Sequence, residues 1–196
     1  MRIFCVSLAV AAFFAAPLQA QTPEKAQAAQ LTPQDKQALA EFNERVKEYV
    51  ALRDGVNKGD AKQRETKDPA KIADARANLA MKIREKRAAA KAGDIFTPYI
   101  QERFRKVLAP EMKGISGQNT KGSIKDEAPA PGSVKLAVNA DYPKDQPLGT
   151  VPPNVLEALP ELPEGVEFRF VDRYLALRDA ESNLIIDFMP AAIPAK

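Results

Sequence analysis

The fold is decided near the C-terminus, where residues 168–188 read FRFVDRYLALRDAESNLIIDF. Three short runs in this stretch alternate large apolar and polar residues, which is the period of a half-buried β-strand. The apolar residues predicted to share one face are Phe168, Phe170, Leu175, Leu177, Leu184, Ile186 and Phe188. Asp172-Arg173 suits a tight turn and residues 180–183 a looser one, so we predict a three-stranded antiparallel meander. Its apolar face must be covered, because leaving it exposed costs more than a domain's net stability.

The N-terminal part of the chain has the period of amphipathic helices instead. Three segments begin with a capping residue and a proline at the first helical position, namely Thr32-Pro33, Asp68-Pro69 and Thr97-Pro98. We expect these helices to end near Gly55 or Gly59, at Gly93, and before Pro110, respectively. The second helix is expected to bury a stripe made of Ile72, Ala75, Leu79 and Ile83.

Two six-residue segments, 49–54 (YVALRD) and 174–179 (YLALRD), differ at one position. The first continues a helical stripe and the second an alternating one. We therefore predict a helix for the first and a strand for the second, because context overrides local propensity.

The chain divides into five segments. We predict a signal peptide at 1–20, a mobile leader at 21–30, a helical region at 31–110, a flexible loop or linker at 111–132 and a small sheet region at 133–190. The sheet region is expected to begin with a strand through Val134, Leu136 and Val138 and to include a short helix within 152–159. The fold class is α+β: about three N-terminal helices pack with a small antiparallel meander, as one unit or as two.

The first residues have the composition of a secretory signal peptide. Arg2 supplies a positive end, residues 3–16 are apolar or small, and Pro17 precedes the predicted cleavage point after Ala20. Such a run is too short to span a bilayer, and no second apolar stretch approaches that length, so no transmembrane anchor is expected after cleavage. We expect an exported protein that begins at Gln21 and resides in a bacterial periplasm or outside the cell.

Composition excludes most catalytic chemistry. The one cysteine, Cys5, lies in the signal peptide, and the chain has no histidine. Ser-His-Asp and Cys-His catalysis, zinc sites built from Cys and His, haem ligation by His and Cys-bound iron–sulfur clusters are therefore excluded for the mature chain. We predict no catalytic, cofactor-binding or metal-binding residues and no enzyme activity. A hydrolase that uses two carboxylates stays open, because it needs neither residue type.

One turn has a partial calcium-loop pattern. Asp179–Asn183 reads D-x-E-x-N, but the sixth and twelfth positions of the loop are Leu184 and Pro190 instead of Gly and Glu. A turn rich in Asp, Ser and Asn explains these residues, and weak calcium binding is the alternative.

The second predicted helix is basic. Its candidate interaction face consists of Lys82, Arg84, Lys86, Arg87 and Lys91. Residues 32–113 hold 19 basic and 13 acidic side chains, whereas residues 114–196 hold 8 and 12. The two halves could attract each other, or the helix could meet anionic lipid or a polyanionic envelope component. Nucleic acid is not expected, because no aromatic residues interleave the basic ones.

Three stretches carry a family resemblance: GDIFTP at 93–98, LPELPEGVEFRFV at 159–171 and NLIIDF at 183–188. Together they resemble a group of uncharacterised exported bacterial proteins, which implies export and a shared α+β organisation but no known activity. The tail alone resembles the C-terminal strands of RcnB-type periplasmic proteins, which are linked to nickel and cobalt homeostasis. The chain has no histidine, the commonest metal ligand in proteins, and in this it differs from what a metal-handling role requires.

These observations favour an exported, non-catalytic interaction or accessory protein that binds a protein or an envelope component. The alternative is an envelope-associated chaperone or polyanion-binding module that uses the basic helix. A carboxylate-based hydrolase is the third hypothesis.

Overall fold

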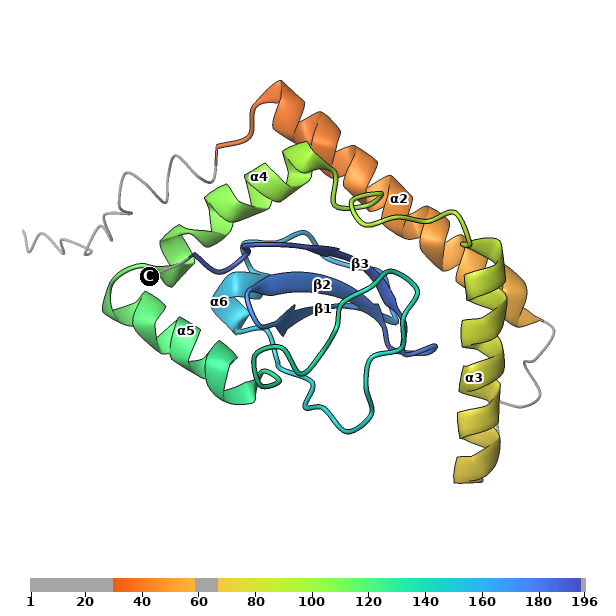
Figure 1. The fold of residues 1–196 in the computed structure, drawn as a ribbon. Helices are drawn as coiled ribbons and strands as arrows, with labels where there is room; N and C mark the ends of the chain where they lie inside the picture. The colour runs from red at the N-terminus through yellow and green to blue at the C-terminus, as the bar shows by residue number, and fades with distance from the viewer. Residues whose placement is uncertain (1–29, 59–66, 195–196) are drawn as a thin grey trace, which may run out of the picture.

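A computed structural model describes residues 30–58 and 67–194. The predicted signal peptide and the leader up to residue 29 lie outside the described residues. The elements are α2 (Pro33–Asn57), α3 (Pro69–Lys86), α4 (Pro98–Leu108), the 3₁₀ helix η2 (Pro110–Met112), α5 (Gly114–Glu127), α6 (Pro153–Leu156), β1 (Val166–Val171), β2 (Tyr174–Asp179) and β3 (Ile185–Met189). The fold is α+β, with helices in the N-terminal part and a C-terminal antiparallel sheet (Figure 1).

The predicted meander is confirmed. The sheet has the strand order β1-β2-β3 with antiparallel pairing. Asp172 and Arg173 form the two-residue turn between β1 and β2, and Asp172 has a φ of +54°. Asn183 lies in the looser turn at a φ of +62°. Both residues belong to the types that tolerate the left-handed region best after glycine.

A β-bulge changes which side chains of β3 face the core. The register shifts between Leu177, which pairs with Asp187, and Arg178, which pairs with Ile185. Asp187 therefore lies on the same face as Leu177 and is fully buried. The prediction that Phe188 lies on this face is wrong: it lies on the opposite face, where its ring is 6.1 Å from that of Tyr174.

One hydrophobic core joins the helices to the sheet. The ring of Phe104 on α4 lies 5.3 Å from Phe42 on α2, 5.9 Å from Phe96 and 6.3 Å from Phe168 on β1. The same cluster includes Leu177 and other residues of the inner sheet face. The helical and sheet regions thus form one unit, in which α2 and α4 cover one face of the sheet (Figure 1).

The starts of the first three predicted helices are confirmed, although the Thr97 side chain makes no capping hydrogen bond at the start of α4. One predicted end is wrong. Thr32 and Asp35 form a capping box at the start of α2, and the Asp68 side chain accepts a hydrogen bond from the N–H of Ala70 at the start of α3. Helix α3 ends at Lys86, and Gly93 lies in the following connection at a φ of +92°. Glycine adopts this positive φ without strain, and its N–H donates a hydrogen bond to Asp187.

The buried stripe predicted for the second helix is only partly confirmed. Leu79 and Ile83 are buried, whereas Ile72 is 44% exposed. The N-terminal half of α3 projects from the body of the molecule, away from the other helices and strands of the described residues (Figure 1).

The predicted linker at 111–132 is wrong over most of its length, because α5 occupies Gly114–Glu127. Its glycines had suggested a loop. Gly117 instead permits close packing: a Cβ atom there would lie 2.1 Å from the carbonyl carbon of Met112 in η2. Helix α5 then places Ile124 in the core.

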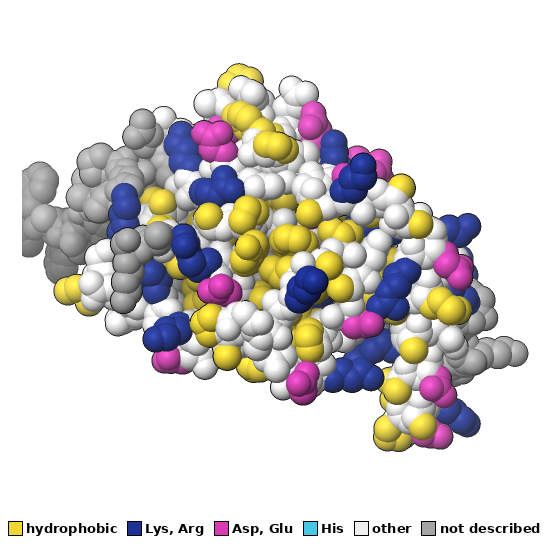
Figure 2. All heavy atoms as spheres, viewed as in Figure 1, with side chains coloured by type: hydrophobic (Ala, Val, Ile, Leu, Met, Phe, Trp, Pro, Cys, Tyr) yellow, Lys and Arg dark blue, Asp and Glu magenta, His cyan; other side chains and the backbone are white. Residues whose placement is uncertain are grey.

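The strand predicted from Val134 to Val138 is absent, because this segment is coil that lies over the outer sheet face. Val134 and Tyr142 pack there against Val171. The residues that follow bond to the start of β3 and to the turn before it: the N–H of Asn139 donates to the carbonyl of Ile185, and the N–H of Tyr142 donates to the carbonyl of Asn183. An isolated bridge joins Asp141 to Leu184. Hydrophobic side chains gather over the sheet in this view (Figure 2).

The short helix predicted within 152–159 is confirmed as α6. Among the described helices, none combines the length and the hydropathy that crossing a membrane requires.

Candidate functional site

A largely apolar groove of about 450 Å³ lies between the start of α2, α4, η2 and α6. We call it the α4–α6 groove. Its walls are mainly apolar and consist of Leu31, Leu39, Phe104, Val107, Pro110, Ala158, Leu159 and Pro160. Its four polar residues are Arg103, Glu111, Asn154 and Glu157. A concave, largely apolar lining with a few polar groups is the usual composition of a ligand pocket.

Arg103 is the unusual residue of the groove. It lies one helical turn from both Ile100 and Val107 on α4, so the helix carries it among apolar side chains. Arg103 is only 5% exposed to solvent, and its Nε atom lies 3.7 Å from Oδ1 of Asp35. Its Nη1 atom is buried and has no hydrogen-bond partner among the described residues. A buried guanidinium with an unused donor is uncommon, because the missing bond costs free energy.

Asp35 holds its position beside Arg103 through the capping box. Oδ2 accepts hydrogen bonds of 2.9 Å from both the N–H and the hydroxyl of Thr32, and Oδ1 accepts one of 3.2 Å from the Tyr99 hydroxyl. The Thr32 N–H is the main cause that lowers the pKa of Asp35 below its ordinary value of 3.8; burial opposes it, and Arg103 acts in the same direction. Arg103 therefore has a charged counterion at neutral pH.

The outer rim of the groove is acidic. Asn154 donates to Oε2 of Glu111 at 3.0 Å and to the hydroxyl of Thr120 at 3.3 Å, which joins α6 to η2 and α5. Glu157 follows α6 and is exposed. The groove thus combines one buried cation, its carboxylate partner and two further carboxylates.

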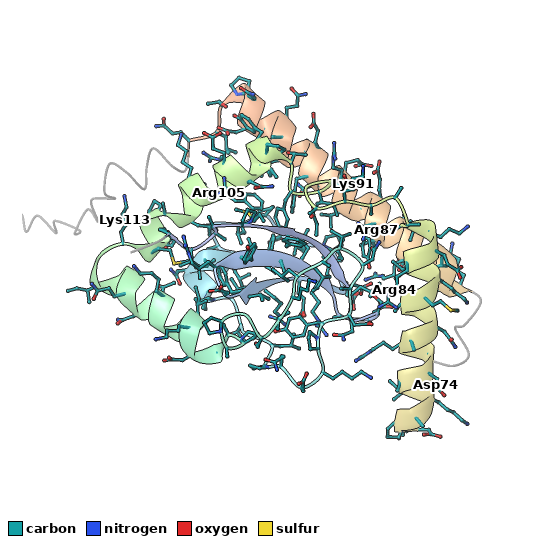
Figure 3. The ribbon with its side chains drawn as sticks, viewed as in Figure 1. Asp74, Arg84, Arg87, Lys91, Arg105 and Lys113 are labelled. Atoms are coloured by element: carbon teal, nitrogen blue, oxygen red, sulfur yellow. The ribbon has the colours of Figure 1, made fainter. Side chains whose placement is uncertain are left out.

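The structure does not bring the predicted basic residues together as one exposed face. Arg84 donates from Nε to the carbonyl of Asn139 at 2.9 Å and pairs with Asp141 at 2.6 Å. Arg87 donates to Oδ1 of Asn139 at 2.8 Å and lies 5.0 Å from the ring centre of Tyr49. Burial lowers the pKa of Arg87. Figure 3 shows both arginines on the side of α3 toward the sheet.

Of the other three basic residues, Lys82 is half-buried, whereas Lys86 and Lys91 are exposed. Lys91 lies beyond the end of α3, in the connection to α4 (Figure 3). The two arginines therefore attach the helical half to the sheet half.

The polar side chains of the Asp179–Asn183 turn form hydrogen bonds within the protein. Asp179 is fully buried, and its Oδ2 accepts hydrogen bonds from the hydroxyls of Tyr49 at 2.7 Å and Ser182 at 2.9 Å. Asn183 accepts from Arg178 at 2.6 Å and donates to the carbonyl of Tyr142 at 2.7 Å. These oxygens already have protein donors, and within residues 30–58 and 67–194 no His, Cys, Asp and Glu group of three or more is placed to hold a metal ion.

A second hollow, of about 470 Å³, contains three carboxylates, Asp54, Glu164 and Glu181. Arg53 lies among them: its Nε is 3.0 Å from Asp54, its Nη2 is 3.8 Å from Glu181 and its Nη1 is 3.6 Å from Asp179. Arg53 also donates to the backbone carbonyl of Glu164 at 3.3 Å. The carboxylates of Asp54, Asp179 and Glu181 thus form an ion-pair network around this guanidinium.

Sequence reasoning missed Arg103 and the groove. A usable signal was present, because Arg103 interrupts the apolar stripe of the third helix between Ile100 and Val107. The groove itself had no such signal, since its walls come from four segments that are distant in the sequence. Comparisons with family models, curated proteins and solved structures found no match to this chain.

Proposed function

We propose that this chain is an exported, non-catalytic binding protein whose α4–α6 groove holds an apolar ligand. The observation that carries the proposal is the apolar groove of about 450 Å³ that contains the buried, incompletely bonded Arg103. Apolar walls supply affinity when they lose contact with water, and a small number of polar groups orient the ligand. The anatomy of residues 1–20 supports export, and the absence of histidine and mature cysteine supports a binding role over catalysis.

The groove is a better candidate than the basic helix for partner binding. Arg84 and Arg87 already bond to Asn139 and Asp141, so binding a polyanion through them would break bonds within the fold. Residues of the groove wall such as Leu31, at 44% exposure, need no such rearrangement.

The proposal is tested with Nile red, an uncharged dye that fluoresces in apolar sites, and with the mature chain from Gln21. We compare Leu31→Glu in the groove wall with Ile72→Glu on α3, because both residues are 44% exposed. A charge in an apolar site disfavours an uncharged ligand, so Leu31→Glu should weaken binding about tenfold. Ile72→Glu should bind like the parent. Equal binding by both variants, or no binding by the parent protein, would contradict the proposal.

A further inference from the structure

The chain carries few side chains that an oxidant attacks readily. Of its four methionines and one cysteine, Met1 and Cys5 lie in the predicted signal peptide, and the sequence has no tryptophan and no histidine. The sulfur of the mature chain is therefore confined to Met81, Met112 and Met189. A thioether sulfur takes up an oxygen atom to give methionine sulfoxide, so the exposure of these three residues decides where an oxidant acts.

Two of the three methionines are enclosed by the fold. Met112 in η2 is 2% exposed and Met189 at the end of β3 is 0% exposed, and both belong to the hydrophobic core. An oxidant reaches their sulfur atoms only when the surrounding elements separate. Met81 on α3 is 50% exposed. The structure thus distinguishes one accessible sulfur from two enclosed ones.

The position of Met81 on α3 keeps its side chain away from the core. Leu79 and Ile83, which are buried, each lie two positions from Met81 and so on nearly the opposite side of the helix. Ala77 and Glu85, one turn before and one turn after Met81, are exposed. Helix α3 itself lies at one end of the molecule (Figure 1). An oxygen atom added to this sulfur therefore meets solvent and leaves the core packing unchanged.

We propose that Met81 is a reversible oxidation site of the folded protein, and that it reacts with two-electron oxidants of the hypohalous acid class, such as hypochlorous acid. A sulfur–oxygen bond forms at Met81 and the oxygen–chlorine bond of the acid breaks. The sulfur is oxidised by two electrons, the chlorine is reduced and leaves as chloride, and the proton of the acid passes to water. Methionine sulfoxide reductases reverse the oxidation.

This site is independent of the α4–α6 groove, because Met81 does not line it. Sulfoxide formation at a core methionine places a polar group among apolar side chains and disrupts packing. The same change at Met81 alters only the surface of α3. An exported chain meets such oxidants outside the reducing cytosol, and Met81 takes up the oxidant without loss of the fold.

The test treats the mature chain from Gln21 with an equimolar amount of hypochlorous acid and locates the added oxygen by peptide mass spectrometry. In the folded chain, Met81 should be oxidised at least about tenfold faster than Met112 or Met189. In urea, where the core is open, the three should react at similar rates. The circular dichroism of the oxidised chain should match that of the untreated chain, and reductases for both sulfoxide epimers should remove the oxygen.

A matched pair of variants assigns the reaction. Met81→Leu keeps an apolar side chain of similar helix propensity and should abolish oxygen uptake by the folded chain. Met112→Leu removes an enclosed sulfur with little change in volume and should leave the uptake unchanged. Circular dichroism verifies that both variants are folded. The comparison of the parent chain in buffer and in urea depends on neither variant.

Three results would overturn the inference. The first is oxidation of Met112 or Met189 as fast as Met81 in the folded chain, which would mean that the core does not enclose them. The second is oxygen uptake by folded Met81→Leu at the rate of the parent. The third is loss of the circular dichroism signal when Met81 alone is oxidised, because its sulfoxide would then disturb the fold.

Discussion

Buried charged residues in this protein each have a specific set of partners. Asp187 accepts hydrogen bonds from the backbone N–H groups of Gly93, Ile95 and Phe96, at 2.9, 2.8 and 2.8 Å, although it lies on the core face of β3. Arg103 differs, because one of its nitrogens has no partner among the described residues. This contrast makes Arg103 the exception among the described residues, since buried polar groups are otherwise satisfied.

Asp35 should make stability depend on pH at the acidic end. Its pKa in the folded protein is lower than its ordinary value of 3.8. The charged carboxylate therefore stabilises the fold above that value, and the stabilisation is lost as the pH falls through the folded-state pKa. Asp35→Asn should lower the free energy of unfolding at pH 7 by about 1 kcal/mol, because it weakens the cap of α2.

Urea unfolding of the parent and of Asp35→Asn measures this difference, which should shrink as the pH falls below the ordinary aspartate pKa of 3.8. Asp74→Asn is the control, because Asp74 is exposed on the projecting half of α3 (Figure 3). A difference that stays constant down to pH 2 would show that the charge of Asp35 is not the cause.

At the scale of elements, α5 depends on tight packing that glycine makes possible. Gly117 lies so close to Met112 that no side chain fits between α5 and η2 without a backbone shift. Gly122 lies in the same helix and has no atom within 4 Å of the position a Cβ would take. Gly117 is therefore required for packing, whereas Gly122 is not, although the sequence alone does not distinguish them.

Alanine substitutions should separate these roles. Gly122→Ala should raise the free energy of unfolding by about 0.5–1 kcal/mol, because alanine favours a helix over the unfolded chain. Gly117→Ala should lower it by about 1–3 kcal/mol, because the added methyl overlaps the Met112 backbone. Urea denaturation followed by circular dichroism measures both. Stabilisation by both substitutions would mean that α5 does not pack on η2 as described.

At the scale of the whole molecule, the near-identical segments 49–54 and 174–179 meet across the junction of the two halves. Tyr49 and Arg53 on α2 both contact Asp179 on β2. Burial and Asp179 raise the pKa of the Tyr49 hydroxyl, so it stays protonated and donates. Together with the shared core, these contacts make the helices and the sheet one folding unit.

Unfolding should therefore be a single transition. Far-UV circular dichroism follows mainly the helices, and near-UV circular dichroism follows tyrosines in both halves. Asp179→Ala should lower the free energy of unfolding by about 3 kcal/mol or more, because it leaves the buried Arg53 without that partner, and both signals should shift together. Asp172→Asn, in the exposed turn, is the control, because asparagine also tolerates the left-handed conformation of this position. Two separate transitions, or a shift in one signal alone, would contradict the single unit.

Local patterns in the sequence predicted the elements whose signals are short-range. The cap and proline pairs at Thr32, Asp68 and Thr97 place three helix starts, and the alternation from Phe168 onward places the meander. Capping and side-chain period act within a few residues, so they can be recognised without the fold. The same kind of signal, the period of the apolar residues, correctly predicts a helix for segment 49–54 and a strand for segment 174–179.

The predictions failed where distant contacts decide the outcome. The glycines in 114–127 indicate a loop when the sequence is considered alone. The structure shows that Gly117 instead allows the helix to pack closely on Met112. The alternation at 134–138 could not show that this segment pairs with none of the described strands. The pattern of β3 could not reveal the bulge that places Asp187 instead of Phe188 on the core face. The groove could not be predicted from the sequence either, because four segments that are distant in the sequence form it.

The sequence by itself determined the α+β class, the starts of three helices, the meander and the absence of histidine, because composition, capping and period are properties of neighbouring residues. Only the tertiary structure decided that Arg84 and Arg87 bind the sheet half, and that Arg103 lies in an apolar groove with a donor unused. Burial and charge pairing depend on residues brought together from distant positions, and these two effects select the candidate site.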